Sequence, residues 1–191
     1  MLKDNARGYG LITIIVHWVS VLAIVFLFGL GLYMTSLSYY EPWYHKGPSL
    51  HVSIGLLLAI LTLARLLWRL FSRSPDPLPN HSLLIRFAAT SAKVVLYALI
   101  FTVLATGYLI TTAEGKGPDI FGWVTFPVLV ELGADNVDLA GEIHLIFAWA
   151  IIVVAALHGL AALVHHFVIR DKTLVRMLKP VKTSTDSHQG D

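Results

Sequence analysis

The chain has 191 residues, of which 56% are hydrophobic and 14% charged, and its formal net charge is +2. A soluble domain is about half apolar and about a quarter charged, so this composition excludes an ordinary soluble protein and indicates a single-domain integral membrane protein. The sequence has no cysteine, which excludes disulfides, iron–sulfur clusters, thiolate zinc sites and covalently attached haem.

Four apolar runs follow one another along the chain, and each is long enough to cross a bilayer, which takes about 20 residues. None shows a period of two, and backbone groups in lipid must be satisfied internally, so we expect helices. The predicted spans are residues 11–35, 49–71, 84–112 and 139–168. They form one domain at 11–179, after an N-terminal segment at 1–10 and before a disordered tail at 180–191.

The basic residues are distributed unevenly over the connections. They precede the first span, surround the connection between the second and third spans, and follow the fourth. The other two connections carry only Lys46 and Lys116 among several acidic residues. Because positive residues collect on the cytoplasmic side, we predict a multi-pass protein with both termini in the cytoplasm.

Four of the nine histidines sort into two pairs by their depth in the spans. His17 and His158 lie toward the cytoplasmic side, and His51 and His144 lie near the outer side. His144 and His158 are fourteen residues apart, which turns a helix by about 1400° and advances it by about 21 Å, so they share one face. This spacing predicts two flat cofactors stacked across the membrane.

Haem b suits these pairs. Neutral imidazole fills the axial positions of a porphyrin iron, and one histidine from each of two facing helices gives a closed, six-coordinate site. Without cysteine the haem is attached non-covalently. A lone membrane histidine is often a packed polar contact, whereas four histidines in two depth-matched pairs favour cofactor ligation.

Arg65 lies fourteen residues after His51 and therefore on the same face, at the depth of the inner pair. A guanidinium suits a haem propionate, so we expect this contact for Arg65 and, more weakly, for Arg69. The alternative is anchoring of both arginines at the cytoplasmic surface by snorkelling. Gly55, one turn after His51, would admit a macrocycle close to the backbone, although helix packing explains it equally well.

Three stretches carry a family resemblance: "VHWVSV" around His17, "LHVSIGLLLAILTLARLLWRL" from His51, and "GEIHLIFAWAIIVVAALHGLAALVHHFVIRDKTLVRM". With these the chain resembles the bacterial cytochrome b561 family, which is related to hydrogenase b-type cytochrome subunits. The resemblance implies an all-α four-helix bundle in the bacterial inner membrane with two haems b. It implies His17 and His158 on the inner haem iron, His51 and His144 on the outer haem iron, and ubiquinone as the redox partner.

His165 follows His158 by seven residues, nearly on the same face and about 10 Å closer to the cytoplasm. A histidine supplies a hydrogen bond and a proton near neutral pH, so we expect His165 at the quinone; the alternative is an interfacial histidine in contact with water. One departure from the family is Lys93 in "SAKVVLY", where a histidine is expected. Snorkelling is favoured for Lys93 over a place in the quinone cavity. We assign no role to His45, His81 and His188, and we expect His166 to be peripheral.

The sequence thus predicts a di-haem b cytochrome that transfers electrons between the periplasmic side and ubiquinone. Similar proteins include a superoxide oxidase, which takes its electron from periplasmic superoxide. Lys46 and Lys116 could attract that anion, although the surrounding acidic residues oppose a strong positive field and ordinary loop charge explains both lysines. One alternative is a non-catalytic electron-transfer subunit serving a dehydrogenase or a periplasmic partner. A remoter one is a haem-free histidine-relay transporter, which normally shows broken helices or inverted repeats. No nucleic-acid partner is expected.

Overall fold

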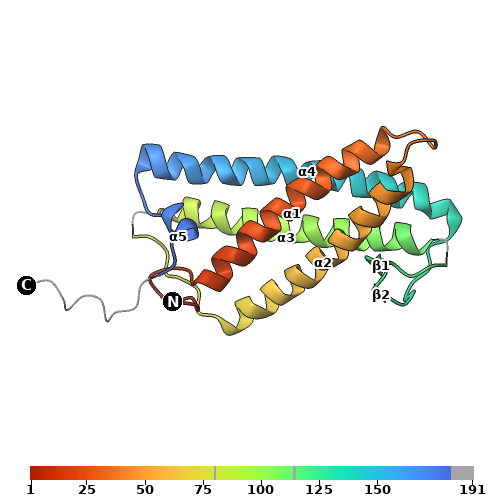
Figure 1. The fold of residues 1–191 in the computed structure, drawn as a ribbon. Coiled ribbons are helices and arrows are strands. Elements are labelled where there is room, and N and C mark those ends of the chain that lie inside the picture. Colours follow the sequence, from red (N-terminus) through yellow and green to blue (C-terminus); the bar gives the residue numbers. More distant parts are fainter. Residues whose placement is uncertain (80, 114, 182–191) are drawn as a thin grey trace, which may run out of the picture.

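The computed structural model describes residues 1–79, 81–113 and 115–181, and its main feature is a bundle of long helices (Figure 1). The long helices are α1 (Leu11–Thr35), α2 (Trp43–Phe71), α3 (Leu83–Thr112) and α4 (Val137–Val164). The shorter elements are β1 (Asp119–Ile120), β2 (Val124–Thr125), the 3₁₀ turn η1 (Ala134–Asn136), the π-helical turn η2 (His165–Ile169) and α5 (Val175–Leu178). The predicted all-α architecture with four long apolar helices is confirmed.

Two helices differ at one end from the predicted spans. Helix α2 begins at Trp43 rather than near residue 49, and Pro48 lies inside it. Pro48 is the sixth residue of this helix, so it lacks an N–H that would otherwise donate to the carbonyl of Tyr44, and it weakens the first turns of α2. Helix α4 continues into η2, and the residue after η2, Arg170, has the left-handed conformation with φ 59°. Such π-helical turns occur frequently at functional sites.

The bundle consists of two closely packed helix pairs, α1 on α2 and α3 on α4 (Figure 1). Contacts between the pairs are fewer, and one of them is the edge-to-face packing of Phe28 on Trp149, with ring centroids 4.8 Å apart. Small hydroxyl side chains are buried inside the bundle, as is common where membrane helices approach closely. Thr62, for example, donates to the carbonyl of Leu58 at 2.7 Å, so its polar group is satisfied within its own helix.

The outer surface of the bundle is apolar. Leu22, Leu160 and many other long apolar side chains point away from the bundle and are exposed. An apolar surface of this extent needs lipid around it, and each of the four long helices is long and apolar enough to cross a membrane. The chain is therefore a multi-pass membrane protein.

Met1 and Val181, the first and last of the described residues, lie at one end of the bundle, here called the terminal end (Figure 1). The N-terminal amino group of Met1 donates to the carbonyl of Val181 at 2.9 Å. Asp4 is buried and accepts from Gly10 N–H at 2.7 Å and from the Thr13 hydroxyl at 2.9 Å, which satisfies the beginning of α1. The opposite end, with β1 and β2, is the hairpin end. From residue 182 onward, the predicted disordered tail lies outside the described residues.

Candidate functional site

His51 on α2 and His144 on α4 face each other near the hairpin end. Their ring centroids are 6.1 Å apart and their planes are inclined by 58°. Two imidazoles on opposite sides of one metal ion have centroids about 6 Å apart when each metal–nitrogen bond is about 2 Å. The observed separation therefore fits a metal ion coordinated between the two rings.

A cavity of about 640 Å³ surrounds this pair and is lined by all four long helices, including His51, His144 and the glycines Gly31, Gly55 and Gly107. Cofactor cavities commonly measure about 300–1,000 Å³ and are mostly apolar, as this one is. Nδ1 of His51 is buried without a hydrogen-bond partner among the described residues. Such an atom is uncommon, and it leaves this nitrogen uncommitted to any hydrogen bond within the part of the chain that the structure describes.

A glycine on a neighbouring helix lies beside each of the two rings, and the space is tight only at Gly107. A Cβ atom at Gly107 of α3 would lie 3.1 Å from Cε1 of His144, and one at Gly31 of α1 would lie 3.5 Å from Cε1 of His51. The hydroxyl of Thr106 lies 3.2 Å from Nδ1 of His144, which leaves Nε2 of that ring as the free ligand atom. The two histidines, the cavity and the neighbouring glycines together fit a haem with two histidine ligands.

His17 on α1 and His158 on α4 lie nearer the terminal end, outside this cavity. Nη2 of Arg65, from α2, lies 3.2 Å from Nδ1 of His17. The Arg65 guanidinium carbon also lies 5.8 Å from the ring centroid of Tyr97 on α3. Arg65 thus reaches the depth predicted for it, and in this structure its contact is a histidine. Arg69, the second arginine predicted to contact a propionate, lies 3.9 Å from the carboxylate of Asp4.

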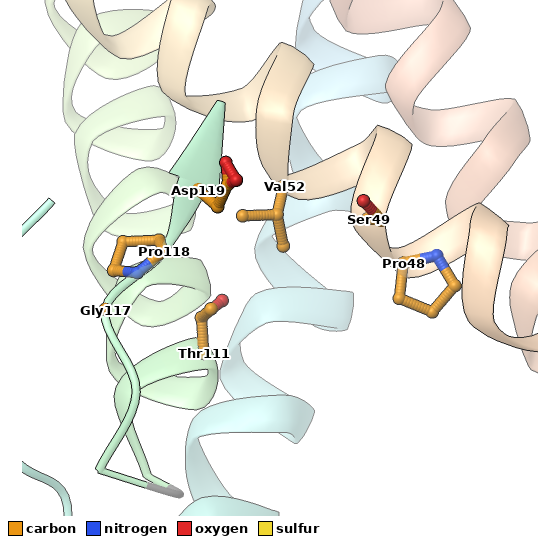
Figure 2. Close-up of a pocket in the computed structure, with 7 residues that line it drawn as sticks. All are labelled: Pro48, Ser49, Val52, Thr111, Gly117, Pro118 and Asp119. Carbon is orange, nitrogen blue, oxygen red and sulfur yellow. The ribbon is translucent and has the colours of Figure 1, made fainter. Parts of the chain in front are cut away.

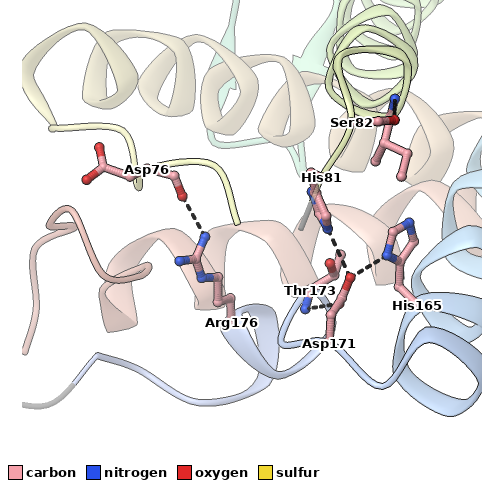
Figure 3. Close-up of polar contacts among 8 residues, drawn as sticks. Asp76, His81, Ser82, His165, Asp171, Thr173 and Arg176 are labelled. Carbon is pink, nitrogen blue, oxygen red and sulfur yellow. Dashed lines mark hydrogen bonds and ion pairs between the residues drawn. The ribbon is translucent and has the colours of Figure 1, made fainter. Parts of the chain in front are cut away.

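A second polar cluster, formed by His81, His165 and Asp171, lies at the terminal end (Figure 3). Oδ2 of Asp171 lies 2.9 Å from Nε2 of His81 and 2.5 Å from Nδ1 of His165. The backbone N–H of Thr173 donates to the other carboxylate oxygen at 2.7 Å. Burial raises the pKa of Asp171, but the hydrogen bonds from Thr173, His81 and His165 outweigh it and bring this pKa well below its usual value.

The structure brings His165 together with His81, to which sequence reasoning assigned no role. His81 lies directly before the N-cap of α3, Ser82, whose hydroxyl accepts from Ile85 N–H at 3.3 Å. Two features of the sequence point toward a role for His81: it follows the proline-rich stretch "SPDPLPN", and it lies on the same predicted membrane side as His165. Lys93 is exposed on α3, and its snorkelling stays a prediction.

At the hairpin end a shallow hollow of about 260 Å³ adjoins the large cavity (Figure 2). The two share four lining residues: Pro48, Val52, Thr111 and Pro118. Ser53, which is 1% exposed, holds the hairpin against α2, because its hydroxyl accepts from Phe121 N–H at 3.0 Å and lies 3.1 Å from the carbonyl oxygen of Asp119. Lys46 and Lys116 are exposed at this end.

Comparison with known proteins matches residues 8–180 to the family described as prokaryotic cytochrome b561. Cytochrome b561 homolog 2 of Escherichia coli K12 is 44% identical over 183 residues, covering 96% of each chain. A probable superoxide oxidase, CybB of Yersinia pestis, is 29% identical over 90% of this chain and 96% of its own. Cytochrome b562 of Cereibacter sphaeroides is 30% identical over 70% of this chain and 69% of its own.

Proposed function

The chain belongs to the prokaryotic cytochrome b561 family and is a haem b membrane cytochrome; from this premise we propose that it carries two haems b and transfers electrons between the periplasmic side of the bacterial inner membrane and ubiquinone. The observation that carries the proposal is the 6.1 Å separation of His51 and His144 across a cavity bounded by all four helices. His158, fourteen residues further along α4 on the face of His144, supports a second haem together with His17.

Haem b, when bound, supplies reversible one-electron chemistry at its iron. The residues of the chain hold and tune it. Thr106 engages Nδ1 of His144, which fixes the tautomer and the ring orientation. Arg65 brings a fixed positive charge to His17, and a positive charge favours the reduced state of a nearby redox centre.

The orientation proposed here has the terminal end in the cytoplasm and the hairpin end in the periplasm. The distribution of lysine and arginine over the connections supports it. An electron donor then approaches the outer pair from the hairpin end, through the hollow (Figure 2), which shares lining residues with the cavity. Superoxide is the proposed donor, because Lys46 and Lys116 are exposed at this end and one relative is named a probable superoxide oxidase.

At the terminal end, His165 is the proposed hydrogen-bond donor and proton source for ubiquinone. Reduction of a quinone to a quinol takes two electrons and two protons, and histidine exchanges protons near neutral pH. Asp171 accepts a hydrogen bond from Nδ1 of His165, so its carboxylate orients the ring and stabilises it when it is protonated. His81 contacts the same oxygen of this carboxylate and adds one more group that exchanges protons to the hydrogen-bonded cluster.

Haem quantification tests the two-haem proposal. We expect two haems b per purified chain, and we expect His51→Ala and His158→Ala each to lose one haem and keep the other. His166→Ala, which changes a histidine outside both pairs, serves as the matched control and keeps both. A colourless wild type would favour the histidine-relay transporter, and retention of both haems in the two ligand variants would refute the pairing.

The electron-transfer subunit is the second candidate, and it is favoured by the relatives named only as cytochromes. Superoxide generated enzymatically and added to the purified protein with ubiquinone separates the two. We expect haem reduction and quinol formation that superoxide dismutase abolishes. If superoxide reduces neither haem while a chemical reductant reduces both, the subunit role replaces the oxidase role.

A further inference from the structure

We propose that His81, His165 and Asp171 form a binding site for one Zn²⁺ ion at the terminal end of the bundle. The site takes one ligand atom from each residue, and these atoms all lie within 4.8 Å of one another. The three ligands come from separate segments: the connection before α3, the π-helical turn η2, and the chain that follows it. The site is therefore a product of the tertiary structure.

The ligand set is one that zinc uses. Two imidazole nitrogens and one carboxylate oxygen, with a fourth position left to water, form a well-known zinc environment. Metal–ligand bonds of about 2.0–2.2 Å in a tetrahedral site place ligand atoms about 3.3 Å apart. Oδ2 of Asp171 now lies 2.9 Å and 2.5 Å from the two nitrogens, so each of these separations widens by less than about 1 Å when an ion replaces the two bridging protons.

The surrounding backbone holds the carboxylate in position for this role. Thr173 N–H occupies Oδ1 of Asp171 at 2.7 Å, so Oδ2 remains the atom directed at both imidazoles (Figure 3). Arg170 in the left-handed conformation turns the chain back, and Asp171 N–H then donates to the carbonyl of His165 at 3.0 Å. Outer contacts of this kind, which fix the orientation of a ligand, are typical of metal sites.

The burial of the cluster suits an exchangeable ion. The side chains of His81 and His165 are each 15% exposed, and that of Asp171 is 9% exposed. An ion can therefore reach the cluster from the terminal surface, while the partial shielding strengthens its attraction to the carboxylate. His166, the next residue along η2, contributes no atom to the cluster, which makes it a matched control for histidine removal.

Zinc at this site would also act on the quinone reaction, and this consequence rests on the proposed function of His165. A metal ion on Nδ1 leaves Nε2 as the only nitrogen of that ring that can carry a proton. It also engages the carboxylate that orients the ring and links it to His81. We therefore expect bound Zn²⁺ to slow ubiquinone reduction, because the ion replaces the hydrogen bonds by which Asp171 holds His165 and His81 together.

The metal site is tested by itself on haem-loaded, chelator-treated, quinone-free protein that carries no polyhistidine tag. Titration with ZnCl₂ against a fluorescent zinc chelator, and metal counting after dialysis, are expected to give one saturable site per chain in the wild type and in His166→Ala. His81→Ala and Asp171→Asn are expected to bind at least about tenfold more weakly. Equal haem content in all four proteins shows that the variants are folded. No saturable site in the wild type, or unchanged affinity in His81→Ala, overturns the proposal.

The quinone consequence is tested separately by comparing each protein with and without ZnCl₂. Ubiquinone reduction is expected to slow on zinc addition in the wild type and in His166→Ala. In His81→Ala the rates with and without ZnCl₂ are expected to be equal. Zinc that binds at one site per chain without changing the wild-type rate refutes the quinone consequence and leaves the metal site standing. A His165→Ala variant that reduces quinone at the wild-type rate in excess chelator refutes the quinone role of His165 itself.

Discussion

Gly107→Ala is expected to weaken haem binding at the hairpin end through a single added methyl group. The new Cβ would lie 3.1 Å from Cε1 of His144, whereas carbon atoms pack best at about 3.5–4.0 Å. The imidazole must therefore retreat by about 0.4 Å or more, which approaches the tolerance of about 0.5 Å for a functional group held in place. Overpacking of this kind costs about 1–3 kcal/mol, which corresponds to about 5- to 150-fold weaker haem binding.

Gly29→Ala is the matched control, because a Cβ at Gly29 meets no atom within 4 Å. Both substitutions share the helix-stabilising effect of alanine over glycine, about 0.5–1 kcal/mol, so their difference isolates the contact with His144. The assay is the rate and extent of haem transfer from purified protein to excess apomyoglobin, with the haem content per chain measured before transfer. We expect faster loss of one haem in Gly107→Ala alone. Equal retention in both variants, or equal loss, would show that the space beside His144 does not matter.

Two further predictions concern the neighbouring contacts. Arg65→Gln removes a positive charge beside His17, and the interaction of that charge with a nearby haem is about 1–2 kcal/mol at an effective dielectric constant of about 20. A redox titration is expected to show one haem potential lowered by about 40–90 mV, at about 59 mV per tenfold change. A shift of neither potential would contradict the placement of Arg65. Ser53→Ala leaves the partly buried N–H of Phe121 without its acceptor, and the lost hydrogen bond costs about 1 kcal/mol. Faster proteolysis within the β1–β2 hairpin with unchanged haem content is expected, and an unchanged cleavage rate would show that Ser53 does not hold the hairpin.

Much of the bundle could be predicted from the sequence because membrane spans depend on local properties. A run of about 20 apolar residues is sufficient to predict a helix in lipid. The rise and rotation per residue then place His144 and His158 on one face without any knowledge of their neighbours. The predicted starts and ends were less accurate where the apolar pattern stops, as at Trp43, because the first turns of α2 lie in the polar stretch ahead of the apolar run and include Pro48.

The contacts around the histidines could not be predicted from the sequence. Gly107 and Gly31 are ordinary glycines in apolar runs until α3 and α1 bring them against His144 and His51. The spacing from His51 predicts only the face and depth of Arg65, whereas its contact with His17 depends on how α2 crosses α1. Such contacts depend on helix packing angles, which the hydrophobic pattern of each helix leaves open.

The sequence by itself determined that this protein is helical, crosses a membrane and carries histidines at two depths, because hydrophobic run length and helical repeat are properties of continuous segments. Only the tertiary structure decided that His81 meets His165 and Asp171. Their meeting depends on the path of the connection between α2 and α3 and on the backbone reversal at Arg170. These long-range contacts depend on the folded chain as a whole, since no periodic pattern links residue 81 with residue 171.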